Sequence, residues 1–172
     1  MYYADIKETD VANGVGFGVS LFVSGCRGNC EGCFNKVAWD FNYGSEFTDK
    51  TMDKILELCG RPYVDFFAVL GGDPLEPENK DTVLSIISRV RSTYPNLSIN
   101  IWTRFLYEDL IKDEVASSIL DLCDELVDGA FVLSKKSLGL VQRGSSNQRI
   151  IDLNKTRVQG SLMLNEELMN RN

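Results

Sequence analysis

Three closely spaced cysteines near the amino terminus constrain this chain more than any other feature. Cys26, Cys30 and Cys33 form the pattern C-x-x-x-C-x-x-C directly after the apolar run 19–23. A 4Fe-4S cluster held entirely by protein takes four cysteine ligands. A loop with three cysteines can instead hold three irons of a cubic cluster, and it leaves the fourth iron open to a small molecule. The sequence therefore predicts a cluster with one open coordination site.

Zinc and disulfides are the alternative uses of these cysteines. A structural zinc site usually takes four Cys or His ligands in short paired spacings. The chain has no histidine, so zinc would have to recruit Cys59 or Cys123 from distant positions. Disulfides are disfavoured because the cysteine count of 5 is odd and the sequence opens without a secretory leader. We therefore expect a reducing, cytoplasmic location.

Composition limits the architecture and the partners. With 172 residues, 44% hydrophobic and 25% charged, we expect one domain spanning 1–172, with its core at about 10–150 and a polar tail at about 151–172. No apolar run reaches the roughly 18 residues of a membrane helix. The formal charge of −7 and the lack of a Lys/Arg cluster argue against nucleic acid.

Hydrophobic periodicity predicts alternating strands and helices. The predicted strands are 19–25, 65–71, 97–103 and 125–132, and the predicted helices are 48–59, 81–94 and about 107–122. This alternation is typical of a parallel sheet with right-handed crossovers. A complete eight-unit barrel needs about 250 residues. The sequence therefore predicts an α/β fold in the form of a small, open, partial (β/α) barrel.

Polar and glycine-rich segments follow each predicted strand. The cysteine loop follows the first strand, Gly71-Gly72-Asp73-Pro74 the second, Thr103-Arg104 the third, and Asp128-Gly129 lies at the fourth. Chemistry in parallel α/β folds collects at the carboxyl ends of the strands. Glycines without a Cβ let the backbone approach a ligand closely. We therefore expect these four segments to meet at one rim.

The cysteine motif, with Phe34 directly after it and a strand before it, resembles the radical S-adenosylmethionine (SAM) superfamily. From about residue 10 to 150 the chain is more narrowly similar to the activating enzymes of anaerobic (class III) ribonucleotide reductase. The segments that carry this similarity are Asn13-Gly-Val-Gly16, Leu21–Cys26, Cys30–Asn35 with Trp39, Gly71–Leu75, Ile101-Trp-Thr103, Val127-Asp-Gly129 and Arg143–Arg149. The chain departs from the pattern at Val15, where proline is common, and at Arg104, which replaces a usual glycine.

This resemblance implies an oxidoreductase of the radical SAM type. Its cofactors would be a 4Fe-4S cluster and SAM, which is cleaved reductively to a 5′-deoxyadenosyl radical. That radical would generate a glycyl radical on the large catalytic subunit of the anaerobic reductase. A flavodoxin- or ferredoxin-type protein would donate the electron.

The resemblance also implies roles for particular residues, with no catalytic side chain beyond the cluster and SAM. Cys26, Cys30 and Cys33 would ligate the cluster. The residues expected to contact SAM are Gly32, Cys33, Phe34, Gly71, Gly72, Asp73 and Asp128. Phe34 would pack near adenine and Gly72 would face the methionine end. For Asp128, a carboxylate that only caps a turn is the alternative.

Other features have structural explanations. We expect Cys59 and Cys123 to pack in the core, and Trp39 and Trp102 to anchor the core edges or line the cavity. For Arg27 we expect a side chain that faces solvent, and the alternative is that it stabilises the negative charge of the cluster. Arg143–Arg149 either ties the chain to the rim or docks a partner, and both roles are compatible. A short helix is expected around Glu166. Two other functions stay open: a radical SAM enzyme acting on a small molecule, and a zinc-binding adaptor.

Overall fold

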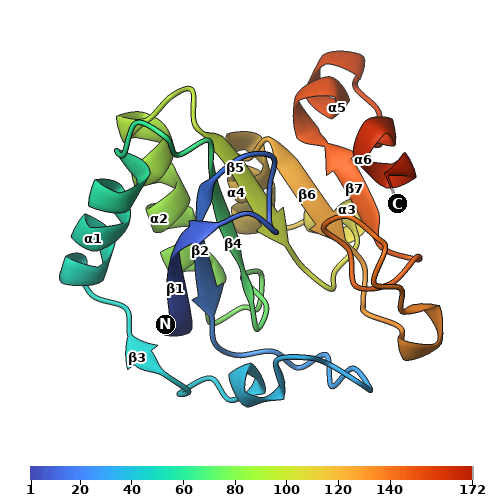
Figure 1. The fold of residues 1–172 in the computed structure, drawn as a ribbon, viewed down its shortest axis with the longest axis horizontal. Coiled ribbons are helices and arrows are strands. Elements are labelled where there is room, and N and C mark those ends of the chain that lie inside the picture. Colours follow the sequence, from blue (N-terminus) through green and yellow to red (C-terminus); the bar gives the residue numbers. More distant parts are fainter. Residues whose placement is uncertain (172) are drawn as a thin grey trace.

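The fold is an open sheet of seven strands, which the computed structural model describes over residues 1–171 (Figure 1). The strand order across the sheet is β3-β1-β2-β4-β5-β6-β7. The strands are β1 (Tyr2–Asp10), β2 (Gly18–Val23), β3 (Ser45–Glu46), β4 (Phe66–Gly71), β5 (Ser98–Trp102), β6 (Glu125–Asp128) and β7 (Arg149–Asp152).

The centre of the sheet is parallel and its edges are antiparallel. Strands β2, β4, β5 and β6 pair in parallel. Strands β1 and β3 close one edge in antiparallel pairing, and β7 closes the other. The predicted α/β fold with a small, open, partial barrel is therefore confirmed, and the four predicted strands form its parallel centre.

Helices connect the parallel strands. The α-helices are α1 (Asp49–Cys59), α2 (Lys80–Thr93), α3 (Tyr107–Leu110), α4 (Glu114–Leu122), α5 (Leu153–Gln159) and α6 (Glu166–Asn170), and two 3-10 turns are η1 (Lys36–Trp39) and η2 (Leu133–Lys135). Helix α1 begins where predicted, because Thr48 caps it and its side chain accepts a hydrogen bond from the Thr51 amide. The short helix expected around Glu166 is α6.

One predicted helix is divided in the structure. The stretch 107–122 forms α3 and α4 rather than a single helix. The break occurs at Asp113, whose backbone is extended and whose side chain accepts a hydrogen bond from the Ala116 amide. An aspartate at this position satisfies a free amide at a helix start, so it begins a new helix instead of continuing the old one.

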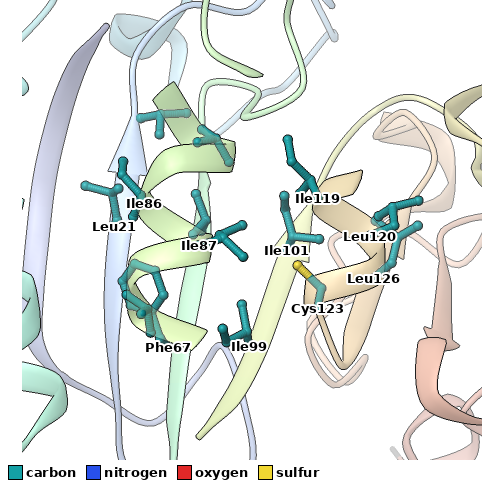
Figure 2. Packing of buried hydrophobic residues seen from close by; sticks show 14 of the residues in the cluster. Leu21, Phe67, Ile86, Ile87, Ile99, Ile101, Ile119, Leu120, Cys123 and Leu126 are labelled. Carbon is teal, nitrogen blue, oxygen red and sulfur yellow. The ribbon is translucent and has the colours of Figure 1, made fainter. Parts of the chain in front are cut away.

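The main core lies between the sheet and helices α1, α2 and α4 (Figure 2). Alternate strand residues point to opposite faces of a sheet. Phe67 and Val69 of β4 therefore pack with Ile86 and Ile87 of α2, and both isoleucines are almost fully buried. Each such side chain contributes about 1.5–3 kcal/mol when it is removed from water. This packing fixes the strands, and their carboxyl ends emerge along one edge.

The outer strands were not predicted from the sequence. Strand β1 precedes the cysteine loop and pairs with β2, and β7 follows the loop 129–148 and pairs with β6. Because β7 is antiparallel, it carries the chain away from the carboxyl ends of the parallel strands. Within residues 1–171, no helix has both the length and the apolar character needed to cross a membrane.

Candidate functional site

The carboxyl ends of the four parallel strands surround one cavity of about 450 Å³. The cavity is lined by all three cysteines of the motif, by the turn 71–73, by Thr103 and Arg104 after β5, and by Gly129 after β6. The sequence placed these segments at one rim, and the structure brings them together there. The long loops at the carboxyl ends of β2 and β6 can be followed in Figure 1.

Backbone hydrogen bonds anchor the cysteine loop at its first cysteine and at the residue before it. The Gly25 amide donates to the Ala38 carbonyl at 2.8 Å and the Cys26 amide to the Trp39 carbonyl at 3.2 Å. Within the loop, the Gly28 amide donates to Cys26 Sγ at 3.3 Å. A Cβ at Gly28 would lie 3.3 Å from Cys26 Sγ and 3.4 Å from Cys30 Sγ, so these two thiols flank the same point.

The three thiols of the motif line one cavity, where they could bind different irons of one cluster. Within residues 1–171, no three His, Cys, Asp or Glu side chains converge as one metal ion requires. In a cubic cluster each thiolate binds a different iron, so the ligands surround the group and need not converge. Cys59 and Cys123 lie in the core between sheet and helices, as expected, and do not line the cavity. The donors therefore suit three corners of a 4Fe-4S cluster.

The Cys26 thiol is held in its protonated form by its surroundings. Burial raises the pKa of the Cys26 thiol to about 11, and the hydrogen bond from the Gly28 amide opposes this effect. Such a thiol keeps its proton at neutral pH, whereas coordination to a metal removes it. Burial also raises the pKa of the Cys59 thiol to about 12, and this thiol lies in the core and does not line the cavity. The two sites differ in their surroundings rather than in intrinsic acidity.

The glycine turn lies directly on the cysteine loop. Gly71 has a φ of +116°, which favours glycine. The Gly72 amide donates to the Val23 carbonyl at 2.7 Å and the Asp73 amide to the Gly25 carbonyl at 2.8 Å. A Cβ at Gly72 would lie 2.6 Å from the Gly25 carbonyl oxygen. Glycine is therefore required here for contact between two backbones.

Asp73 connects the turn to the end of β5. Its carboxylate is buried and accepts hydrogen bonds from the Thr103 hydroxyl at 2.8 Å and from the amides of Arg104 and Leu75 at 3.0 Å each. Burial raises its pKa to about 6, and these hydrogen bonds oppose the shift. Asp73 lines the cavity, but its carboxylate oxygens already accept hydrogen bonds from groups of the protein. Its expected contact with SAM stays a prediction.

Gly32 and Phe34 form the mouth of the cavity. Gly32 has a φ of +73°, and a Cβ there would lie 2.6 Å from Leu133 Cδ1. The Phe34 side chain is 85% exposed although it lines the cavity. An exposed aromatic ring beside the third cysteine is available to a ligand, which is compatible with its predicted position near adenine.

Asp128 is the one predicted ligand-binding residue that does not line the cavity. It is fully buried, and its carboxylate accepts hydrogen bonds from Arg149 Nε and the Tyr107 amide, each at 2.9 Å. Arg149 also pairs with Glu108. These contacts agree with the capping alternative, and direct contact with SAM would require this arrangement to open.

The segment Arg143–Arg149 ties the rim together. The Gln148 side chain donates to the Gly129 carbonyl at 2.9 Å and accepts from the Gly144 amide at 2.9 Å. Asn147 donates to the Ala130 carbonyl at 2.8 Å. The segment therefore fixes both ends of the loop that follows β6, as one of its two predicted roles requires. Arg27 is 53% exposed, as expected for an arginine facing solvent.

Sequence reasoning missed one wall of the cavity. Residues Phe131, Lys136, Ser137, Leu138, Leu140 and Gln142 line it, and Trp102 Nε1 donates to the Gln142 carbonyl at 2.9 Å. Trp39 and Trp102 also line the cavity, one of the two positions considered for them. The only local signal for this wall is an apolar and polar mixture without periodicity, which is typical of a loop.

Comparisons with known proteins agree with this site. A family model described as a 4Fe-4S single cluster domain matches residues 12–151, which include the three cysteines and every strand-end segment of the cavity. The match covers the parallel centre of the sheet and its loops, and it begins after β1.

Similar proteins are described as anaerobic ribonucleoside-triphosphate reductase-activating proteins. The chain is 37% identical to the one from Salmonella typhimurium over 150 residues, which cover 86% of this chain and 96% of the relative. It is 34% identical to the one from Enterobacteria phage T4 over 150 residues, covering 87% and 93%. For Vibrio cholerae the identity is 36% over 152 residues, covering 87% and 97%. The chain belongs to the family of anaerobic ribonucleoside-triphosphate reductase-activating proteins and contains its 4Fe-4S domain.

Proposed function

We propose that this chain is a radical SAM enzyme of the cytoplasm that activates an anaerobic ribonucleoside-triphosphate reductase. Cys26, Cys30 and Cys33 would hold the 4Fe-4S cluster, and SAM would occupy the cavity beside them. The relatives' names supply the reductase as partner. The observation that carries the proposal is one cavity lined by three thiols and a glycine turn, with both remaining cysteines in the core.

A cluster held by Cys26, Cys30 and Cys33 and reduced by a flavodoxin- or ferredoxin-type donor would supply one electron to the SAM sulfonium. The bond between sulfur and the 5′ carbon would break to give methionine and a 5′-deoxyadenosyl radical, which would take a hydrogen atom from a glycine Cα of the reductase. The chain's own residues bind, orient and shield. Gly71 and Gly72 line the cavity, and because they lack side chains the turn packs directly on the backbone at Val23 and Gly25. The cavity of about 450 Å³ lies within the range of roughly 300–1,000 Å³ typical of small-molecule sites.

The mouth of the cavity favours a protein substrate over a small molecule. Phe34 and Leu138 line the cavity and are 85% and 93% exposed. Leu133, which lies next to Gly32, is 40% exposed. Apolar side chains this exposed at a cavity mouth are typical of a surface that a protein covers. We infer that the loop of the reductase that carries the glycine docks here and completes the enclosure from water.

The first experiment tests the cluster. Protein purified without oxygen should contain about four irons and four sulfides per chain. Cys26→Ala, Cys30→Ala or Cys33→Ala should each abolish the cluster, whereas Cys59→Ala and Cys123→Ala should retain it. Stoichiometric zinc in place of iron would support the adaptor and refute the enzyme.

The second experiment tests the reaction. Reduced protein, SAM and the reductase from the same source should produce a glycyl radical, seen as a doublet in the electron paramagnetic resonance spectrum. The Cys30→Ala protein should produce neither this radical nor 5′-deoxyadenosine. Formation of 5′-deoxyadenosine with no radical on the reductase would favour the small-molecule alternative.

A further inference from the structure

A buried carboxylate behind the cysteine loop joins two arginines. Glu76 is 1% exposed, and its Oε1 accepts hydrogen bonds from the Arg27 amide at 2.8 Å and from Arg104 Nη2 at 2.9 Å. Its Oε2 accepts from Arg27 Nη1 at 3.0 Å. The Arg27 guanidinium also pairs with Glu78. Both carboxylate oxygens are therefore engaged, and Glu76 has no part in the mechanism proposed above.

Arg104 extends from this carboxylate to the cysteine loop. A Cβ at Gly28 would lie 2.9 Å from Arg104 Cδ, and the same point lies 3.3 Å from Cys26 Sγ and 3.4 Å from Cys30 Sγ. The guanidinium carbon lies 4.0 Å from the centre of the Phe105 ring. Arg104 is thus held by Glu76, by Asp73 and by the Phe105 ring, and its side chain is only 28% exposed.

The ion pair is oriented with its positive end toward the cavity. Arg104 lines the cavity together with the three cysteines, whereas Glu76 does not. The charge of Glu76 is compensated by two cations, and one of these is itself shared with Glu78. Asp73 is the one carboxylate among the lining residues. Three hydrogen-bond donors surround its oxygens, and its Oδ2 lies 3.8 Å from Arg104 Nε, so Arg104 is the cation that faces both Asp73 and Glu76. Arg104 is therefore a fixed positive charge at the thiols.

We propose that Arg104, positioned by Glu76, raises the reduction potential of the cluster held by Cys26, Cys30 and Cys33. The potential of an iron–sulfur cluster depends on local charge, hydrogen bonds and exposure. Reduction adds one negative charge, so a fixed cation stabilises the reduced state more than the oxidised state. The proposal rests on the cluster of the proposed function and on neither SAM nor the reductase.

The step is a transfer of one electron. A low-potential donor, either dithionite or a flavodoxin-type protein, is oxidised by one electron, and the cluster is reduced from the 2+ to the 1+ state. No covalent bond forms or breaks, and no proton moves. A neighbouring charge therefore acts on this equilibrium only through its electrostatic interaction with the added electron.

Potentiometric titration of the loaded protein without SAM or reductase tests the proposal, with the electron paramagnetic resonance signal of the reduced cluster as the readout. At the wild-type midpoint, Arg104→Gln should lower the ratio of reduced to oxidised cluster by at least about tenfold, which is about 59 mV for one electron. Arg104→Lys keeps the charge and should stay within about threefold of wild type. Lys36→Gln removes an exposed cation near the loop and should leave the ratio unchanged.

Glu76→Gln separates charge from structure. It breaks the same ion pair as Arg104→Gln but removes the opposite charge, so the ratio should rise. Loss of structure alone would shift both variants in the same direction, and that outcome would overturn the proposal, as would an unchanged ratio in Arg104→Gln. If Arg104→Gln fails to hold the cluster, the direction of the change in the ratio of reduced to oxidised cluster in Glu76→Gln tests the proposal: an increase supports it and a decrease overturns it. Wild-type protein without iron would refute the proposed function itself, and this result is distinct from a loaded protein without a shift.

Discussion

Glu125 gives the chain a measurable dependence of stability on pH. This residue is 8% exposed at the start of β6, where it lies opposite Asp152 of β7. Its Oε2 accepts a hydrogen bond from Asn165 at 3.1 Å, and its Oε1 has no partner. Burial raises the pKa of this carboxyl from 4.5 to about 7, the nearby Asp152 acts in the same direction, and the Asn165 amide opposes the shift.

The raised pKa of Glu125 makes the protein less stable as pH rises. Below pH 4.5 Glu125 is protonated in both the folded and the unfolded state, and its contribution to stability is complete. As pH rises toward 7, the unfolded state loses the proton while the folded state retains it, so the free energy of unfolding falls. Each pH unit in this window costs about 1.4 kcal/mol. Between pH 5.5 and 8.5 the loss is about 2 kcal/mol, since it ends once the folded state also ionises.

Glu125→Gln removes this loss, and thermal unfolding measures it. The melting temperature of the variant relative to wild type should increase by roughly 4–8 °C between pH 5.5 and 8.5, because 1 kcal/mol corresponds to about 2–4 °C at this chain length. Glu57→Gln removes a carboxylate from an exposed position of α1 and serves as the control. A difference between Glu125→Gln and wild type that is the same at both pH values would refute the reasoning.

Three further predictions concern the site and its supports. In Gly72→Ala the new Cβ meets the Gly25 carbonyl oxygen at 2.6 Å. We expect the free energy of unfolding to fall by about 3 kcal/mol and the iron content per chain to fall as well. An iron content equal to that of wild type would show that the two loops can separate freely. Asp128→Asn weakens a buried ion pair with Arg149. We expect the free energy of unfolding to fall by about 3 kcal/mol, which corresponds to roughly 6–12 °C in melting temperature. An unchanged melting temperature would contradict the capping role of Asp128. Cys59→Ala should keep the iron and sulfide content of wild type, whereas loss of the cluster would show that this thiol is a ligand.

The parallel centre of the sheet was predictable because its signals are local. Thr48 and the apolar spacing of 49–59 define α1 within the sequence itself, and β4 is a continuous apolar run. The edges carry no comparable signal. Strand β1 has three partly buried residues at its start and three consecutive exposed residues, 7–9, near its end, so it lacks a clear alternation, and its pairing depends on β2. The division between α3 and α4 depends on one side chain, Asp113, which periodicity does not weigh.

The site was predictable only at the strand ends. Each segment expected at the rim contributes residues to the cavity lining, although Asp128 itself does not line it. This was predictable because the carboxyl ends of neighbouring parallel strands lie along one edge of the sheet. The wall formed by residues 131–142 depends on contacts between distant segments, such as Trp102 with the Gln142 carbonyl and Gln148 with the Gly129 carbonyl. Hydrogen bonds of this kind leave no pattern in the sequence, since any loop can offer a carbonyl.

The glycine turn and the cysteine loop behave as one structural unit. The Asp73 amide binds the Gly25 carbonyl, the Glu76 carboxylate binds the Arg27 amide, and the Asn79 side chain binds the Ser24 carbonyl at 2.9 Å. The backbone on both sides of Cys26 is thus held without any contribution from metal. Ordering a free residue costs about 1–2 kcal/mol, so a loop already fixed at its first ligand binds a cluster with a smaller entropic loss. The same contacts make the geometry at Cys26 depend on the turn. This dependence explains why the segment 71–79 combines glycines, which allow close backbone contact with the cysteine loop, with buried acidic and amide side chains, which hold that loop in place.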